Sequence, residues 1–113
     1  MIVLHGAPGS QNGYAGSGLM GPILFPSNSS NIDRSLNVLK NLTEEFSQQD
    51  VYGNTVTSIE LLNEPDVFTS AFTMNELQTF YTEGISTVHG ADATMNVSLS
   101  GEIPHCVSLH HSR

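Results

Sequence analysis

Residues 59–65 read Ile-Glu-Leu-Leu-Asn-Glu-Pro, a short apolar run that ends abruptly in an amide, a carboxylate and a proline. Proline cannot donate a hydrogen bond within a central β-ladder, so Pro65 ends a strand and leaves Asn63 and Glu64 at its carboxyl end. Active sites of parallel α/β sheets collect at the carboxyl ends of the strands. The stretch therefore predicts a central strand and the place where chemistry would occur.

Two further strands are predicted on either side of this one. Residues 1–4 are apolar and β-branched, as in a buried parallel strand, residues 55–62 form the central strand, and residues 94–100 form the last. Helical segments between them give the order strand-helix-strand-helix-strand, which indicates a parallel sheet with right-handed crossovers. Such a sheet is normally buried on both faces, and two helices cover only one. We therefore expect an α/β section of a larger barrel or sheet.

The two helices are predicted from apolar residues at helical spacing. The first is expected over about residues 32–46, with Asp33 or Asn31 as its cap. The second is expected to start at Thr73 or Asn75 and to run to about residue 90. The intervening segments are predicted to be irregular. They are a long glycine-rich loop over residues 6–31, a polar turn over residues 48–54 and a second loop up to residue 72.

Composition excludes several classes of function. The chain has 113 residues and a formal net charge of −8, with Arg34, Lys40 and Arg113 as its basic residues, so we expect no nucleic-acid partner. No apolar run approaches the ~20 residues needed to cross a bilayer, and the first residues lack the pattern of a signal peptide. We therefore expect no membrane partner and no export signal here. A single cysteine, Cys106, allows no internal disulfide.

Three glycosylation sequons, at Asn28, Asn41 and Asn96, fit a secreted glycoprotein. Roughly two would arise by chance in a chain so rich in serine and threonine, so they carry little weight.

Glu64 is the first candidate for chemistry. If strand alternation continues back from Glu64, then Glu60 and Ser58 share its face, and two carboxylates line one interior. A general acid needs a raised pKa, which burial near a second carboxylate supplies, and a neighbouring amide such as that of Asn63 can hold a substrate hydroxyl. The alternative interpretation is that Glu64 caps the turn that follows it.

His5 follows the first strand at the position equivalent to Glu64 on a neighbouring strand, so the two side chains are expected to face one cleft. A structural histidine is the alternative. The glycine-rich residues 6–13 lack the lysine and the directly following helix of a phosphate-binding P-loop. They also resemble an α/β-hydrolase oxyanion loop, but the chain has no Gly-x-Ser-x-Gly elbow.

Potential metal ligands occur near the end of the chain. Their spacing matches no zinc pattern, and we predict no metal site and no cofactor. The residues are His105, Cys106, His110 and His111.

Residues 4–13, 36–39 and 59–65 together resemble the fungal exo-β-1,3-glucanases of glycoside hydrolase family 5. The resemblance covers about residues 2–99. It implies a (β/α)8 barrel of which this chain supplies about strands three to five, so that residues 1–100 are part of a catalytic domain. It also implies hydrolysis of β-1,3-glucan from the nonreducing end with retention of configuration, by an enzyme that is extracellular or in the cell wall. This chain, if folded, is expected to be a monomer.

The resemblance assigns roles to individual residues. Glu64 matches the acid/base of the family, Asn63 the neighbouring residue that binds the sugar, and His5 the active-site histidine of the third strand. The family's nucleophile is a glutamate of the seventh strand, which this chain does not contain. Departures are Val3 where the family usually has aspartate, and Ala15-Gly16 where it has Asp-Asn, which puts sugar contacts near the nonreducing end in doubt.

Residues 101–113 no longer follow the family, and we expect a divergent tail that is disordered or out of frame. We therefore expect a fragment of a glucanase that does not hydrolyse glucan efficiently alone. The alternatives are a noncatalytic glucan-binding remnant, or a parent enzyme that cuts β-1,6-glucan or cellulose.

Overall fold

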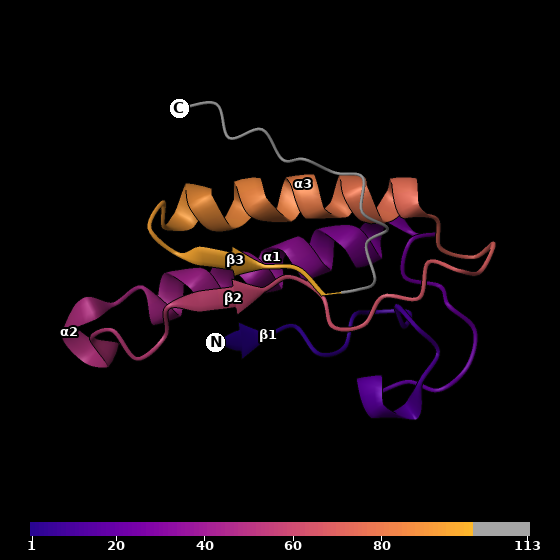
Figure 1. Ribbon diagram of the computed structural model, residues 1–113, viewed down its shortest axis with the longest axis horizontal. Coiled ribbons are helices and arrows are strands. Elements are labelled where there is room, and N and C mark those ends of the chain that lie inside the picture. Colours follow the sequence, from indigo (N-terminus) through magenta and orange to yellow (C-terminus); the bar gives the residue numbers. More distant parts are fainter. Residues whose placement is uncertain (101–113) are drawn as a thin grey trace.

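The three expected strands form one parallel sheet in the order β1-β2-β3 (Figure 1). They are seen in a computed structural model, which describes residues 1–100 of the chain. The expected order of strands and long helices is confirmed, and two short helices are added to it. The elements are β1 (Ile2–Val3), η1 (Ala15–Ser17), α1 (Ser29–Phe46), α2 (Gln49–Tyr52), β2 (Ser58–Glu60), α3 (Met74–Ala91) and β3 (Asn96–Ser98).

The strand β2 lies in the middle of the sheet, where Glu60 pairs with Val3 on one side and with Ser98 on the other. Backbone bonds extend each ladder past the strands themselves, because Leu4 N donates to Glu60 O (3.1 Å) and Leu61 N donates to Ser98 O (3.2 Å). The α/β class is thus confirmed. A three-stranded parallel sheet with crossover helices is compatible with part of a (β/α)8 barrel.

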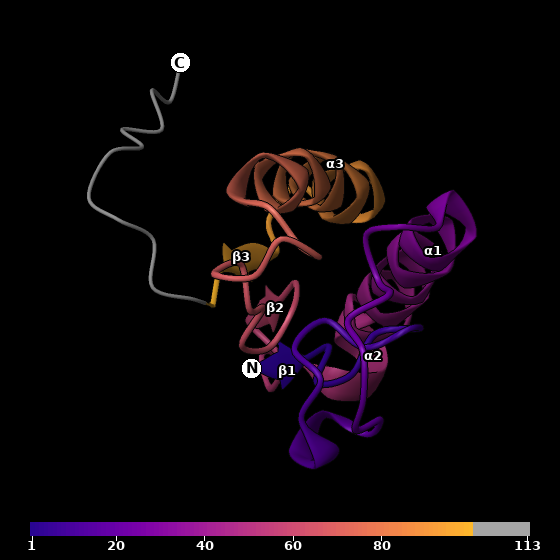
Figure 2. The ribbon, with the colours of Figure 1, turned by 90° about the vertical axis from the view of Figure 1, so that its right-hand side faces the viewer.

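Helices α1 and α3 lie side by side on the same side of the sheet (Figure 2). The carboxyl-terminal ends of the two helices are joined by a hydrogen bond from the Ser47 hydroxyl to the Asp92 carboxylate (2.8 Å). On β2, Ile59 is fully buried, whereas Ser58 and Glu60 before and after it are only half-buried. This is the alternation expected of a strand with one covered face.

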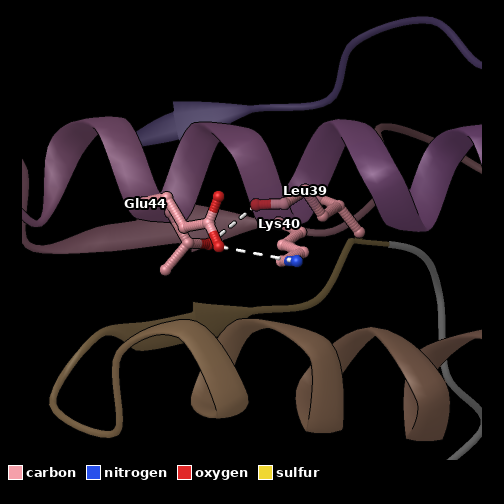
Figure 3. Close-up of polar contacts among 4 residues, drawn as sticks. Leu39, Lys40 and Glu44 are labelled. Carbon is pink, nitrogen blue, oxygen red and sulfur yellow. Dashed lines mark hydrogen bonds and ion pairs between the residues drawn. The ribbon is translucent and has the colours of Figure 1, made fainter.

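Helix α1 begins earlier than the sequence suggested. Its cap is Asn28, whose side-chain oxygen accepts a hydrogen bond from Ser30 N (3.0 Å), so neither Asp33 nor Asn31 is the cap. Leu39 is fully buried toward the core, and on the exposed surface Lys40 Nζ lies 3.6 Å from Glu44 Oε1 (Figure 3). An exposed pair of this kind contributes little to stability, so burial rather than charge holds the helix in place.

The short helices occupy segments that were expected to be irregular. The 3-10 helix η1 lies in the long loop after β1, and α2 lies in the predicted polar turn. The Tyr52 ring at the end of α2 packs against Phe46 with ring centroids 4.9 Å apart, and its hydroxyl donates to Glu45. Contacts with the end of α1 therefore stabilise a turn that is too short to be helical by propensity alone.

An aromatic cluster joins the loop after β1 and the loop before α3 to helix α3 itself. The Phe25 ring, which is fully buried, meets Phe80 of α3 edge to face at 5.2 Å and Phe72 at 5.6 Å. Farther along α3, Gly84 faces β2, and a Cβ added there would lie 2.8 Å from Leu61 Cδ1. A side chain at position 84 would therefore require the buried Leu61 side chain or the helix to shift. Within residues 1–100, no helix is long and apolar enough to cross a bilayer.

Helix α3 begins with a capping box at Thr73, which is one of the two starts predicted for it. The Thr73 hydroxyl accepts from Glu76 N (3.3 Å), and the Glu76 carboxylate accepts from Thr73 N (2.8 Å) and from the Thr73 hydroxyl (2.7 Å). These hydrogen bonds from the Thr73 side chain and backbone hold the pKa of Glu76 below its usual value. The ionised form of Glu76 therefore stabilises the native helix.

The replacement Glu76→Gln is expected to remove a pH-dependent contribution to stability. Because the native pKa of Glu76 lies below the unfolded value of about 4.3, its contribution is present above that pH and is lost as pH falls. Urea unfolding should show wild type more stable than Glu76→Gln at pH 7, with the gap closing toward pH 3. Glu83→Gln, on the exposed surface of the same helix, is the control. A gap that stays constant with pH would contradict the prediction.

Candidate active site

The carboxyl ends of β1 and β2 bring the predicted site residues to one edge of the sheet. His5 follows β1 by two residues, and Asn63 N donates a hydrogen bond to Leu4 O (3.0 Å), directly before His5. Asn63 is half-buried, whereas the side chains of His5 and Glu64 are exposed. The parallel arrangement of the strands therefore places these three residues next to one another, as parallel pairing requires.

A buried glutamine holds this edge together. The Gln11 side chain is fully buried, and its Nε2 donates to His5 O (3.0 Å) and to Asn63 O (2.9 Å), while its Oε1 accepts from Ala7 N (3.0 Å). One amide thus uses both of its donors and an acceptor on backbone groups of two different loops. It fixes the backbone spacing between His5 and Asn63.

Asn12 makes a second set of bonds beside the first. Its Nδ2 donates to Ser17 Oγ (2.8 Å) and to Glu64 O (3.0 Å), and its Oδ1 accepts from Tyr14 N (2.9 Å). Only 3% of Asn12 is exposed. The glycine-rich loop after β1 is therefore attached at two neighbouring side chains to the segment that carries Asn63 and Glu64.

The backbone of Glu64 has left the strand. Its φ is +42°, in the left-handed region, and β2 ends four residues earlier at Glu60. Leu61 and Leu62 are both fully buried, so the strand alternation that was expected to place Glu60 and Glu64 in one buried interior is wrong. The positive φ turns Glu64 outward, and its side chain is exposed rather than buried.

The turn-capping interpretation of Glu64 finds no supporting contact. Among residues 1–100, the Glu64 carboxylate accepts no hydrogen bond, and it is Asp66 that caps the turn, by accepting from Phe68 N (3.1 Å). The backbone of Glu64 is instead held by other side chains. Glu64 N donates to Ser100 Oγ (3.1 Å), and Glu64 O accepts from Asn12.

Tyr81 of α3 is bonded to the segment that follows β3. Its hydroxyl donates to Ser100 O. Burial is the larger cause that raises the pKa of Tyr81, and the nearby Glu60 carboxylate raises this pKa further. The phenol therefore keeps its proton and remains a donor throughout the physiological pH range.

Several N–H groups of the glycine-rich loop are bonded within the loop. Gly13 N donates to Ser10 Oγ (2.8 Å), and Ala7 N and Tyr14 N donate to the side chains of Gln11 and Asn12. In the part of the chain that the structure describes, no group of His, Cys, Asp and Glu could hold a metal ion. The histidines and cysteine of the predicted metal-free tail lie outside the described residues.

Sequence comparison shows what the chain is similar to. No protein-family model matches it. It is 40% identical to glucan 1,3-beta-glucosidase 2 of Wickerhamomyces anomalus over 96 residues, which are 85% of this chain and 22% of that protein. It is 35% identical to probable glucan 1,3-beta-glucosidase A of Aspergillus clavatus over 88% of this chain and 23% of that protein. Its relatives are fungal glucan 1,3-beta-glucosidases.

The resemblance to fungal β-1,3-glucan-cleaving enzymes is thereby confirmed. The chain spans about a fifth of the length of the glucan 1,3-beta-glucosidases it matches, as the glucan 1,3-beta-glucosidase of Pichia angusta also shows, with 39% identity over 77% of this chain and 19% of that protein.

Three residues that hold this edge of the sheet in place were not predicted as site residues. Gln11 and Asn12 were read only as part of a loop motif, and Ser100 only as the end of a strand. One signal was present for Asn12, because an asparagine beside a glycine typically bonds to backbone two residues on, as its Oδ1 does by accepting from Tyr14 N.

Proposed function

We propose that this chain supplies the acid/base carboxylate of a β-glucan hydrolase, with Glu64 in that role. The observation that carries the proposal is the 40% identity over 96 residues to a protein named as a glucan 1,3-beta-glucosidase. The placement of His5, Asn63 and Glu64 at one strand edge supports it. The whole enzyme is proposed to act on β-1,3-glucan outside the cell or in the cell wall.

The proposed reaction proceeds with retention and uses two carboxyl groups about 5 Å apart. Glu64 protonates the leaving glycosidic oxygen while a second carboxylate, outside this chain, attacks the anomeric carbon. Glu64 then removes a proton from the water that hydrolyses the glycosyl-enzyme intermediate. The exposure of Glu64 suits the first step, because the leaving oxygen must reach its carboxyl group.

Asn63 and His5 are proposed to bind the sugar that occupies this edge. The Asn63 amide has a donor and an acceptor for sugar hydroxyls, while its backbone N–H and carbonyl are bonded to Leu4 and Gln11 and stay fixed. The exposed His5 ring adds a second polar group, and its backbone is fixed by the same glutamine. Rigid backbones under polar side chains are what oriented sugar binding requires.

Titration of the isotope-labelled chain with laminaritriose tests the binding part of the proposal. Amide and side-chain NMR signals of His5, Asn63 and Glu64 should shift saturably, whereas exposed residues of α1 such as Asn37 should not. Cellotriose and gentiobiose, run in parallel, separate a β-1,3 preference from β-1,4 and β-1,6 preferences. Absence of saturable shifts with all three sugars would count against binding by this chain.

A chimera tests the hydrolytic part. The segment of this chain that matches the Wickerhamomyces anomalus protein would replace the corresponding segment there, and glucose release from laminarin would be measured. Retained hydrolysis is expected. A folded chimera that binds laminaritriose without hydrolysing laminarin would favour the noncatalytic binding alternative.

A further inference from the structure

Glu64 adopts a backbone conformation that needs outside support. A φ of +42° lies in the left-handed region, which residues other than glycine rarely occupy unless neighbouring groups hold them there. Both backbone polar groups of Glu64 are bonded to side chains that come from other strands or loops. The conformation is therefore imposed by contacts distant in sequence and not by the residue itself.

The first contact comes from Ser100, two residues after the end of β3. Ser100 Oγ accepts from Glu64 N (3.1 Å), and Ser100 is itself fixed by the Tyr81 hydroxyl, which donates to Ser100 O. Because Tyr81 lies on α3 and is only 6% exposed, the helix holds Ser100 in place. The contact thus connects the packing of α3 to the amide of Glu64.

The second contact comes from the loop after β1. Asn12 Nδ2 donates to Glu64 O (3.0 Å), and the orientation of its amide is fixed because Oδ1 accepts from Tyr14 N (2.9 Å). A flipped amide would place two donors against Tyr14 N–H and an oxygen against Glu64 O. Asn12 therefore presents a donor to Glu64 in the orientation that satisfies both loops.

We propose that Asn12 and Ser100 are positioning residues that hold Glu64 in its left-handed conformation and so direct its carboxylate out of the strand edge. The inference rests on the proposed function for its catalytic meaning, since it concerns the same carboxylate. The part that concerns the backbone conformation of Glu64 does not depend on the proposed function. If both contacts are lost, the backbone of Glu64 relaxes to negative φ, and the side chain turns to a different face.

Two variants of the full chain remove the contacts one at a time. Ser100→Ala removes the acceptor of Glu64 N, and Ser98→Ala, the same change two residues earlier in β3, is its control. Asn12→Asp keeps the acceptor for Tyr14 N, and Ser17 Oγ can donate to the new carboxylate, but Glu64 O loses its donor. Ser100→Thr keeps a hydroxyl and is expected to restore the wild-type behaviour.

The readout is NMR of Glu64 without any ligand. Ser100→Ala should raise the exchange rate of the Glu64 amide about tenfold, as expected for loss of one hydrogen bond, while Ser98→Ala leaves it unchanged. Asn12→Asp should move the Cα and Cβ shifts of Glu64 away from left-handed values. If Asn12→Asp fails to fold, Ser100→Ala still decides. Unchanged exchange and shifts of Glu64 in the folded variants would overturn the proposal.

Laminarin turnover separates the positioning role from the proposed function. In the chimera, with Ser100 included in the exchanged segment, Ser100→Ala should lower kcat/KM severalfold, and Ser100→Thr should restore it. If the unsubstituted chimera hydrolyses no laminarin, the proposed function fails while the ligand-free signals of Glu64 still judge the positioning role. If Ser100→Ala hydrolyses laminarin as fast as the unsubstituted chimera although the Glu64 signals have moved, the conformation of Glu64 has no consequence for catalysis, which overturns the positioning role.

Discussion

Glu64→Gln in the laminarin-hydrolysing chimera is expected to lower kcat/KM by about 10²- to 10⁴-fold, the usual contribution of a general acid/base. Glutamine has almost the same shape and keeps the exposed position, but it has no acidic proton for the leaving oxygen. The measurement is glucose release from laminarin over a range of substrate concentrations. Binding of laminaritriose should change far less than turnover, because the lost interaction belongs to the transition state.

Two controls make this result specific. Glu44→Gln removes a carboxylate that is exposed on α1 and paired with Lys40, and it should leave kcat/KM unchanged. An aryl glucoside with an acidic leaving group needs no proton, so its cleavage should suffer much less from Glu64→Gln in the glycosylation step. If Glu64→Gln hydrolysed laminarin within threefold of the unsubstituted chimera, Glu64 would not be the acid/base.

Gln11→Leu is expected to lower the free energy of unfolding of the chain by about 3–4 kcal/mol. It leaves three backbone groups without their partner, namely the N–H of buried Ala7 and the carbonyls of His5 and Asn63 at the partly buried edge, and an unpaired group costs about 1–3 kcal/mol when it is fully buried. Small domains have only about 5–15 kcal/mol in total. Urea unfolding followed by circular dichroism measures the loss.

Gln78→Leu, at an exposed position of α3, is the matched control and should change the free energy of unfolding by about 0.5 kcal/mol or less. Gln11→Glu adds a pH test. Its carboxylate would face two carbonyl oxygens, so the native state binds a proton more tightly than the unfolded state does, and stability rises as pH falls. Equal losses in Gln11→Leu and Gln78→Leu would show that the buried amide has no special importance.

Much of the fold follows from local sequence pattern. The helical spacing of apolar residues predicted α1 and α3, and parallel pairing followed from the order of elements. The errors lie where a single contact decides. Helix α1 begins a few residues earlier than expected because the Asn28 side chain accepts a hydrogen bond from an N–H of the first turn. The segment expected to be a polar turn contains a short helix because Tyr52 packs on Phe46.

The site was predictable only in part. A proline after an apolar run correctly indicated that β2 ends before Asn63 and Glu64, and parallel strands then bring His5 to the same edge. The alternation argument failed because it assumed extended backbone up to Glu64, where φ is positive. The bonds from Gln11 to Asn63 and from Asn12 to Glu64 each join residues 52 positions apart, and no local pattern encodes contacts at that separation.

Gly84 connects the packing of α3 to the site. A Cβ at this position would lie 2.8 Å from Leu61 Cδ1, so a side chain there requires the buried Leu61 side chain or the helix to shift. Tyr81 lies one turn earlier on the same helix, and a shift of the helix would carry its hydroxyl away from Ser100. A substitution at a buried position of α3 would then change the conformation of Glu64 through Tyr81 and Ser100, without touching the strand edge itself.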